Sequence, residues 1–157
     1  MHGRIEVILF LLIALPVTII DVREYRIPDF LTFGGIAAFI LLKLLWNEQP
    51  AWTLVSEGAV GFGVFGLIWW ITRGQIGLGD AKYSAFIAVA AGFSTWFAAL
   101  FIASVVGVVT AAVLIVLFKA DRTTRIPFAP FLTVGAALSF LLMMTTSLRS
   151  ILPDFRM

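Results

Sequence analysis

The sequence predicts an all-α fold: a polytopic membrane protein folded as a single-domain bundle of six transmembrane helices. Hydrophobic residues make up 61% of the 157-residue chain and charged residues 13%, whereas soluble domains are under half apolar and roughly one-quarter charged. The mean hydropathy is +1.06, and most charges lie in short runs between long apolar segments. These three observations exclude an ordinary soluble domain, and we expect no second domain at this length.

Six apolar segments are expected to cross the membrane. The run from Tyr83 to Phe118 holds 36 residues without a charge, about twice the ~20 residues that one crossing of a ~30 Å hydrocarbon core requires. It therefore has to turn once, and Gly92–Thr95 is the predicted hairpin, which starts the fourth helix near Asp80. The other segments are expected at about Ile5–Ile20, Pro28–Trp46, Trp52–Thr72 and Ile126–Leu148.

Four glycines in the third segment predict close contact with a neighbouring helix, because the absence of a side chain lets two backbones approach. They are Gly58, Gly61, Gly63 and Gly66.

The cations are distributed unequally between the two ends of the predicted bundle. Seven lie in the loops between segments one and two, three and four, and five and six, and four lie on the opposite side. The positive-inside rule therefore predicts a multi-pass protein of the inner (plasma) membrane, with these three loops in the cytoplasm and both termini outside. The seven are Arg23, Arg26, Arg73, Lys82, Lys119, Arg122 and Arg125, and the four are Arg4, Lys43, Arg149 and Arg156.

Residue composition limits the chemistry that the chain can perform. There is no Cys and the only His is His2, which excludes thiol nucleophiles and makes His-based triads or multi-His metal sites implausible. No metal or organic cofactor is expected, and a net charge of +2 gives no reason to expect a nucleic-acid partner. Carboxylates, hydroxyls, Lys and Arg remain.

Two carboxylates, Asp21 and Asp80, are predicted to meet at the cytoplasmic face although they are 59 residues apart in sequence. Two facing carboxylates in a site of low dielectric share a proton, so that one acts as general base and the other as general acid on a water molecule. Such a pair hydrolyses a peptide bond. Gly77 and Gly79 are expected to let an extended substrate backbone approach and to give the loop conformations that other residues resist.

A structural role is the alternative for each acid. Either Asp21 or Asp80 could anchor a helix at the interface or pair with Lys82 or Arg23. Asp29 is expected to complement the dipole of the second helix, Lys82 to anchor the fourth helix, and Glu57 to lie near the outer face.

Three sequence blocks together resemble the type IV prepilin peptidase family of membrane aspartic proteases. The blocks are Asp21 followed by Arg26-Ile27-Pro28-Asp29-Phe30-Leu31-Thr32, then Gly77-Leu78-Gly79-Asp80-Ala81-Lys82, then Ile126-Pro127-Phe128-Ala129-Pro130-Phe131-Leu132. The resemblance implies a GxGD-type aspartic endopeptidase with Asp21 and Asp80 as its catalytic pair. It also implies that the substrate is a prepilin or pseudopilin-like precursor of a type IV pilus or protein-secretion system. Cleavage of its basic leader would follow a glycine, on the cytoplasmic side.

The chain departs from the family pattern at two places. Family members commonly have Asn where this chain has Asp29, and larger members carry an insertion with paired CxxC motifs between the first two helices. Here that loop is a few residues long and Cys is absent, so we expect a minimal form and do not predict N-methyltransferase activity.

Pro28 and Pro127 each precede an apolar segment and are hypothesised, with Gly77 and Gly79, to wall the cleft and contact the substrate. Both prolines also suit the start of a helix and could do only that. Two other functions remain open: a small carboxylate-dependent transporter, and a non-catalytic pilus assembly or chaperone-like subunit. A transport site is expected nearer the middle of the membrane than Asp21 and Asp80.

Overall fold

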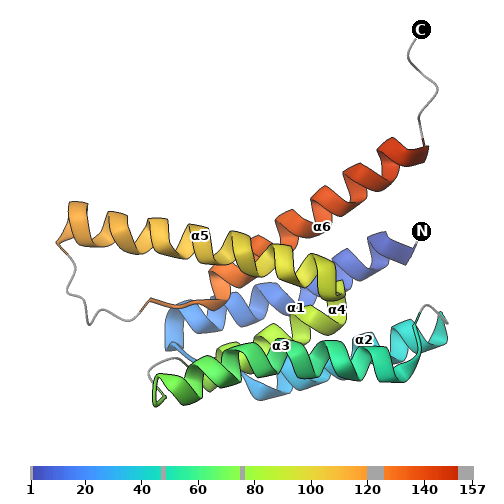
Figure 1. Cartoon of the computed structure of the whole chain (residues 1–157), viewed down its shortest axis with the longest axis horizontal. Helices are drawn as coiled ribbons and strands as arrows, with labels where there is room; N and C mark the ends of the chain where they lie inside the picture. The colour runs from blue at the N-terminus through green and yellow to red at the C-terminus, as the bar shows by residue number, and fades with distance from the viewer. Residues whose placement is uncertain (1, 47–48, 75–76, 120–125, 152–157) are drawn as a thin grey trace, which may run out of the picture.

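The computed structural model describes residues 2–46, 49–74, 77–119 and 126–151, and these form six helices and no strand (Figure 1). The all-α bundle predicted from the sequence is therefore confirmed. The helices are α1 (His2–Glu24), α2 (Asp29–Leu45), α3 (Ala51–Ile71), α4 (Leu78–Ala91), α5 (Phe93–Phe118) and α6 (Ala129–Ile151).

Successive helices run in alternating directions along the bundle. The ends of α1, α3 and α5 lie at the left in Figure 1, away from the N-terminus. The start of α4 follows the end of α3, so the last turn of α1 and the first turn of α4 reach the same end of the bundle. The predicted meeting of the Asp21 and Asp80 segments depends on this alternation.

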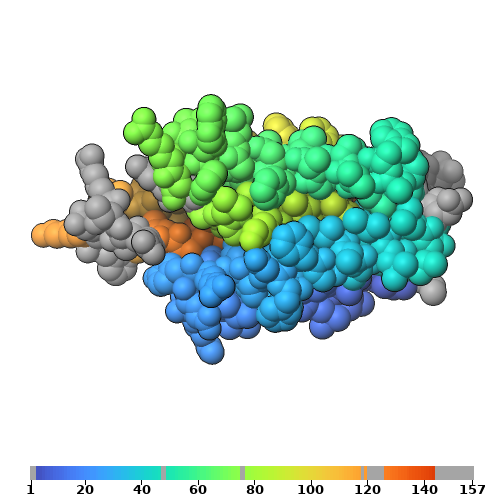
Figure 2. Space-filling model, turned by 90° about the horizontal axis from the view of Figure 1, so that it is seen from below, coloured from blue at the N-terminus to red at the C-terminus, as the bar shows by residue number. Residues whose placement is uncertain are grey.

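Helix α4 forms the centre of the core and contacts α2, α3, α5 and α6. Ala81 and every residue from 83 to 90 are buried, and only a strip of α4 is visible between α3 and the α1–α2 pair in Figure 2. Its 14 residues span about 21 Å at ~1.5 Å per residue, less than the ~30 Å hydrocarbon core. Because protein surrounds it, α4 does not need a full-length apolar surface of its own.

The outer surface is apolar, as expected for a protein in lipid. Within the described ranges, three helices are long and apolar enough to cross a membrane: Gly3–Glu24, Ala51–Ile71 and Phe93–Leu117. On α5 the exposed side chains include Val108, Val116 and Leu117, each at least 69% exposed. Large exposed apolar surface marks a site of contact with lipid or a protein partner, which supports an integral membrane protein.

Glycines permit close helix crossings at α3–α4 and at α5–α6. A Cβ on Gly61 would lie 2.8 Å from the Cβ of Ala88, so the prediction that α3 approaches a neighbour closely is confirmed there. Gly58 faces Val89 in the same way, whereas Gly63 has open space around its Cα. Gly135 of α6 lies directly against the backbone of Ala99 in α5.

Two boundaries differ from the sequence prediction. Helix α1 continues to Glu24, so Asp21 belongs to a helix and not to the loop. The helix tolerates this acid because its side chain has a partner on α6, described below. The turn between α4 and α5 needs only Gly92, at φ 77° and ψ 162°, a conformation that side-chain-bearing residues rarely adopt.

Candidate active site

The end of α1 presents Asp21 and then reverses the chain. The backbone N–H of Tyr25 donates to the carbonyl of Asp21 at 2.9 Å, and Tyr25 has φ 51°. A non-glycine residue in the left-handed region is uncommon and often marks a functional segment. The turn at Tyr25 directs Arg26, Ile27 and Pro28 across the start of α4.

The two glycines of the Gly77-Leu78-Gly79-Asp80 block serve different purposes. A Cβ on Gly79 would lie 3.1 Å from the Cβ of Ile27, so Gly79 lets the α1–α2 loop pack against α4. A Cβ on Gly77 would lie 3.4 Å from Oδ2 of Asp80. Gly77 itself has φ −68°, which any residue adopts, so the predicted need for an unusual loop conformation is wrong at Gly77.

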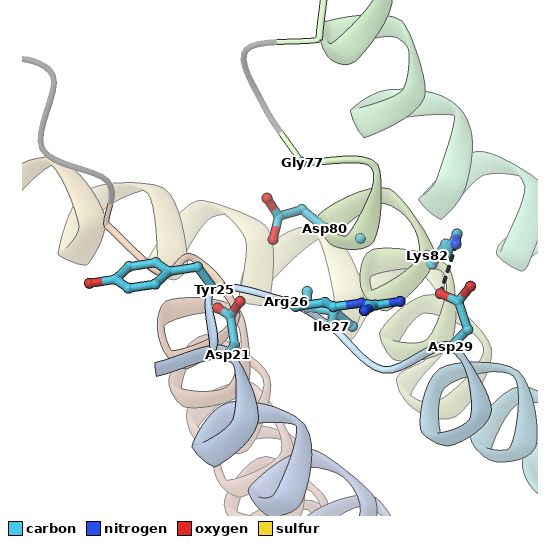
Figure 3. A pocket seen from close by; sticks show the side chains of 9 residues that line it. Asp21, Tyr25, Arg26, Ile27, Asp29, Gly77, Asp80 and Lys82 are labelled. Atoms are coloured by element: carbon cyan, nitrogen blue, oxygen red, sulfur yellow. Dashed lines mark hydrogen bonds and ion pairs between the residues drawn. The ribbon is translucent and has the colours of Figure 1, made fainter. Parts of the chain in front are cut away.

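A cavity of about 260 Å³ opens where the α1–α2 loop faces the start of α4. Figure 3 shows Asp21 on α1 and Asp80 on α4 lining this one space from its two sides. Asp21 is only 5% exposed, whereas Asp80 is partly exposed. The cavity is lined by Asp21, Tyr25, Arg26, Ile27, Asp29, Gly77, Gly79, Asp80 and Lys82.

Asp21 has a hydrogen-bond partner on a third helix. The backbone N–H of Ala129, the first residue of α6, donates to Oδ2 of Asp21 at 3.1 Å. The N-terminus of a helix carries unpaired amide donors and the positive end of its dipole, and both stabilise a carboxylate. This contact offsets part of the cost of burying the Asp21 carboxylate.

The model of the type IV leader peptidase family matches residues 7–112, which is more than half of the chain and includes Asp21 and Asp80. The chain belongs to the type IV leader peptidase family. The matched range ends before the Ile126–Leu132 block, so the contact from Ala129 to Asp21 is an observation of the structure alone.

Curated relatives of this leader peptidase family member are all named prepilin leader peptidase/N-methyltransferase. The protein from Xanthomonas campestris pv. campestris is 27% identical over 126 residues, covering 77% of this chain and 44% of its own length. The protein from Aeromonas salmonicida is 26% identical, covering 88% and 50%, and that from Bacillus subtilis is 24% identical, covering 85% and 54%. This chain thus spans about half the length of these relatives. No solved structure matches it.

Lys82 forms an ion pair with Asp29 that agrees with its predicted role as an anchor of the fourth helix. Nζ of Lys82 lies 2.7 Å from Oδ1 of Asp29, so these residues join α4 to the start of α2. The same ammonium lies 5.7 Å from the ring centroid of Phe33. Asp29 thus has a cation partner besides the helix dipole, and Lys82 pairs with Asp29 instead of Asp80. Asp80 and Lys82 are two residues apart on one helix, and residues at that spacing do not face one another. This spacing could have indicated that Lys82 pairs elsewhere.

Among the site residues predicted from the sequence, the structure brings Asp21, Asp80, Gly77 and Gly79 to the cavity and leaves the two prolines outside its lining. Pro28 caps the N-terminus of α2, and its carbonyl accepts the N–H of Thr32 at 3.3 Å. Pro127 lies two residues before α6. Both therefore sit at helix starts, as their alternative structural role predicted.

Tyr25 and Arg26 line the cavity although they were not predicted as site residues. Both residues lie in sequence between Asp21 and the Ile27–Asp29 segment, and this position could have indicated that they line the cavity. No group of three metal-ligand side chains (His, Cys, Asp or Glu) comes together within the part of the chain that the structure describes.

Proposed function

We propose that this chain is a membrane aspartic endopeptidase that cleaves the leader of prepilin or pseudopilin-like precursors. The observation that carries the proposal is the shared cavity. Asp21 of α1 and Asp80 of α4 both line it although they are 59 residues apart in sequence. Membership of the type IV leader peptidase family supports it. The names of the relatives supply the substrate class.

The surroundings of the two acids assign them different roles. The N–H of Ala129 stabilises a charged Asp21, and two nearby carboxylates do not both ionise readily. Asp80, which projects into the partly exposed side of the cavity, then carries the shared proton. Asp21 is thus the general base and Asp80 the general acid.

The reaction follows from these roles. A water molecule between the acids loses a proton to Asp21 as its oxygen attacks the scissile carbonyl carbon, while Asp80 protonates the carbonyl oxygen. The carbon–nitrogen bond of the resulting tetrahedral diol then breaks. The proton on Asp21 passes to the leaving amine, and the re-forming carbonyl returns a proton to Asp80, so the initial protonation state is restored.

The cavity suits a basic leader that is followed by an apolar segment. Three of its lining residues are acidic, Asp21, Asp29 and Asp80, and Gly77 and Gly79 offer little bulk beside the reacting carbonyl. We place this end of the bundle in the cytoplasm because seven of the eleven cations belong to its helix ends and the adjoining loops. Lys43, counted on the opposite side, is buried and contributes nothing to that surface. We also propose that Pro28 and Pro127, which lie outside the cavity lining, contact the substrate beside the cleft.

The positions of the acids argue against the alternatives. Asp21 lies in the final turns of α1 and Asp80 in the first turn of α4, whereas a transport site is expected near the middle of the membrane. A non-catalytic assembly subunit would not require both acids to line one cavity. N-methylation is not part of the proposal.

Leader cleavage in cells tests the proposal. The chain is co-expressed with a prepilin-like substrate, and cleavage is followed by gel shift and N-terminal sequencing for wild type, Asp21→Asn and Asp80→Asn. Glu24→Gln is the matched control, because Glu24 is exposed at the same end of α1 and does not line the cavity. We expect cleavage after glycine by wild type and control, and none by either Asp variant. Normal cleavage by both Asp variants would refute the endopeptidase.

A further inference from the structure

Three hydroxyl groups from three helices meet in the core next to the two acids. Oγ1 of Thr133 lies 2.7 Å from Oγ1 of Thr18 and 2.6 Å from the phenol oxygen of Tyr83. Thr18 precedes Asp21 by three residues on α1, and Tyr83 follows Asp80 by three residues on α4. Residues three apart share a helix face, so Thr133 of α6 joins the two helices one turn beneath the acids.

Hydrogen-bond accounting fixes the direction of each contact. A threonine hydroxyl has one proton and two acceptor lone pairs. The proton of Thr133 goes to the carbonyl of Ala129 at 2.9 Å. Thr133 must therefore accept from both Thr18 and Tyr83, which uses its full capacity. Tyr83 is fully buried and Thr133 is 6% exposed, so no bulk water competes for these bonds.

The same network reaches Asp21 through Ala129. The carbonyl of Ala129 accepts from Thr133, and its N–H donates to Oδ2 of Asp21. The next residue, Pro130, has no N–H, and the amides of Phe131 and Leu132 both donate to the carbonyl of Phe128. Within the described first turn of α6, Ala129 alone has an N–H directed at Asp21, and Thr133 holds that residue in place.

We infer that Thr133 is a positioning residue that sets the orientation of Asp21 through Ala129, with Tyr83 and Thr18 holding its hydroxyl in place. Without the Thr133 hydroxyl, the N–H of Ala129 is no longer held in line with Oδ2 of Asp21, and the phenol of Tyr83 loses its acceptor. The carboxylate of Asp21 then loses its fixed orientation toward the attacking water. This inference rests on the proposed peptidase function.

A positioning role differs measurably from a packing role. Thr133 does not line the cavity, so substrate binding should not depend on its hydroxyl, whereas the chemical step should. A displacement of about 1 Å in a catalytic group can slow a reaction by about 100-fold. The expected signature is therefore a fall in kcat with KM unchanged, reversed when only the hydroxyl is restored.

The test compares Thr133→Val with Thr133→Ser in purified protein, using a purified prepilin-like precursor as substrate. Valine keeps the shape of threonine and removes the hydroxyl, and serine restores it. We expect Thr133→Val to lower kcat by about 10- to 100-fold with KM within about twofold of wild type. Thr133→Ser should return kcat to within about threefold of wild type.

Ser139→Ala is the matched control on the same helix. Ser139 is also buried and donates to the carbonyl four residues before it, at 2.8 Å from Gly135, but no contact connects it to Asp21. We expect its kcat to equal that of wild type. An equal fall in Ser139→Ala, or in both Thr133 variants, would assign the effect to packing and overturn the inference.

Two further results separate this inference from the proposed function. Wild-type kcat in Thr133→Val, alongside an inactive Asp21→Asn, overturns the inference and leaves the peptidase intact. An active Asp21→Asn refutes the peptidase itself. If Thr133→Val does not accumulate as folded protein, the double variant Thr18→Val/Tyr83→Phe decides, because it keeps the Tyr83 ring packed on Phe86. A wild-type kcat in that variant overturns the inference.

Discussion

A buried acid lies toward each end of this bundle, Glu57 at one end and Asp21 at the other, and the two acids have different surroundings. At the α4–α5 turn, Oε1 of Glu57 accepts the N–H of Phe93 at 3.3 Å, and the buried Lys43 supplies an opposite charge nearby. At the other end, Asp21 and Asp80 line an open space, and the nearby Lys82 is paired with Asp29.

The difference shows how an apolar bundle separates structural from reactive acids. Glu57 is 8% exposed, and the charge of Lys43 and the N–H of Phe93 offset only part of the cost of burying its carboxylate. Asp21 and Asp80 line one space large enough for water, where a negative charge on one opposes ionisation of the other. Such an arrangement stores unfavourable electrostatic energy, and functional sites commonly do so.

The largest expected effect comes from removing either member of the Asp pair. Asp21→Asn and Asp80→Asn should each lower kcat for leader cleavage by about 1,000-fold or more, because one side chain can then neither donate nor accept the proton. Protein yield and melting temperature should not fall, since neither acid has a cation partner among the described residues. Steady-state cleavage by purified protein measures this, and a variant with more than a tenth of wild-type kcat would contradict it.

The opposite end should respond in stability instead of activity. Lys43→Met removes the cation that favours the charge of the buried Glu57. This should destabilise the fold, by less than the ~3 kcal/mol lost when a buried ion pair in direct contact is broken, while kcat per folded molecule stays unchanged. The double variant Lys43→Met/Glu57→Gln removes both charges and should recover most of the loss. Thermal unfolding in detergent checks both. A stable single variant would mean that Lys43 and Glu57 do not interact.

The sequence was sufficient to predict the bundle, the turn at Gly92 and the meeting of Asp21 with Asp80. Apolar segment lengths and alternating topology determine these features. The sequence did not show that Glu57 is buried, because the N–H of Phe93 and the charge of Lys43 come from other helices. The Lys82–Asp29 ion pair and the N–H of Ala129 were missed for the same reason: each contact joins segments 53 to 108 residues apart.

Glycine substitutions test whether the packing of the α1–α2 loop on α4 positions the two acids at the cavity end. Gly79→Ala places a Cβ 3.1 Å from that of Ile27, so the α1–α2 loop has to move away from α4, and kcat should fall by about tenfold. Gly63→Ala is the matched control, because a Cβ there meets nothing within 4 Å. Parallel cleavage assays measure both, and equal rates in the two variants would mean that the Ile27 contact does not position the acids.

The Lys82–Asp29 pair should give the smallest effect. The two side chains are 23% and 59% exposed, and ion pairs at such sites contribute at most about 1 kcal/mol because water and salt screen them. Lys82→Met and Asp29→Asn should each change kcat less than threefold. The exchange variant Asp29→Lys/Lys82→Asp, which re-forms an ion pair, should have the kcat of wild type. A loss as large as that of Asp80→Asn would assign Lys82 to the chemistry.

The most direct test of the account measures kcat and melting temperature together for Asp80→Asn and Glu57→Gln under the same detergent conditions. We predict an inactive Asp80→Asn that melts at or above the wild-type temperature, and an active Glu57→Gln that melts below it. An active Asp80→Asn, or a Glu57→Gln that is inactive with an unchanged melting temperature, would contradict the division into a reactive and a structural end.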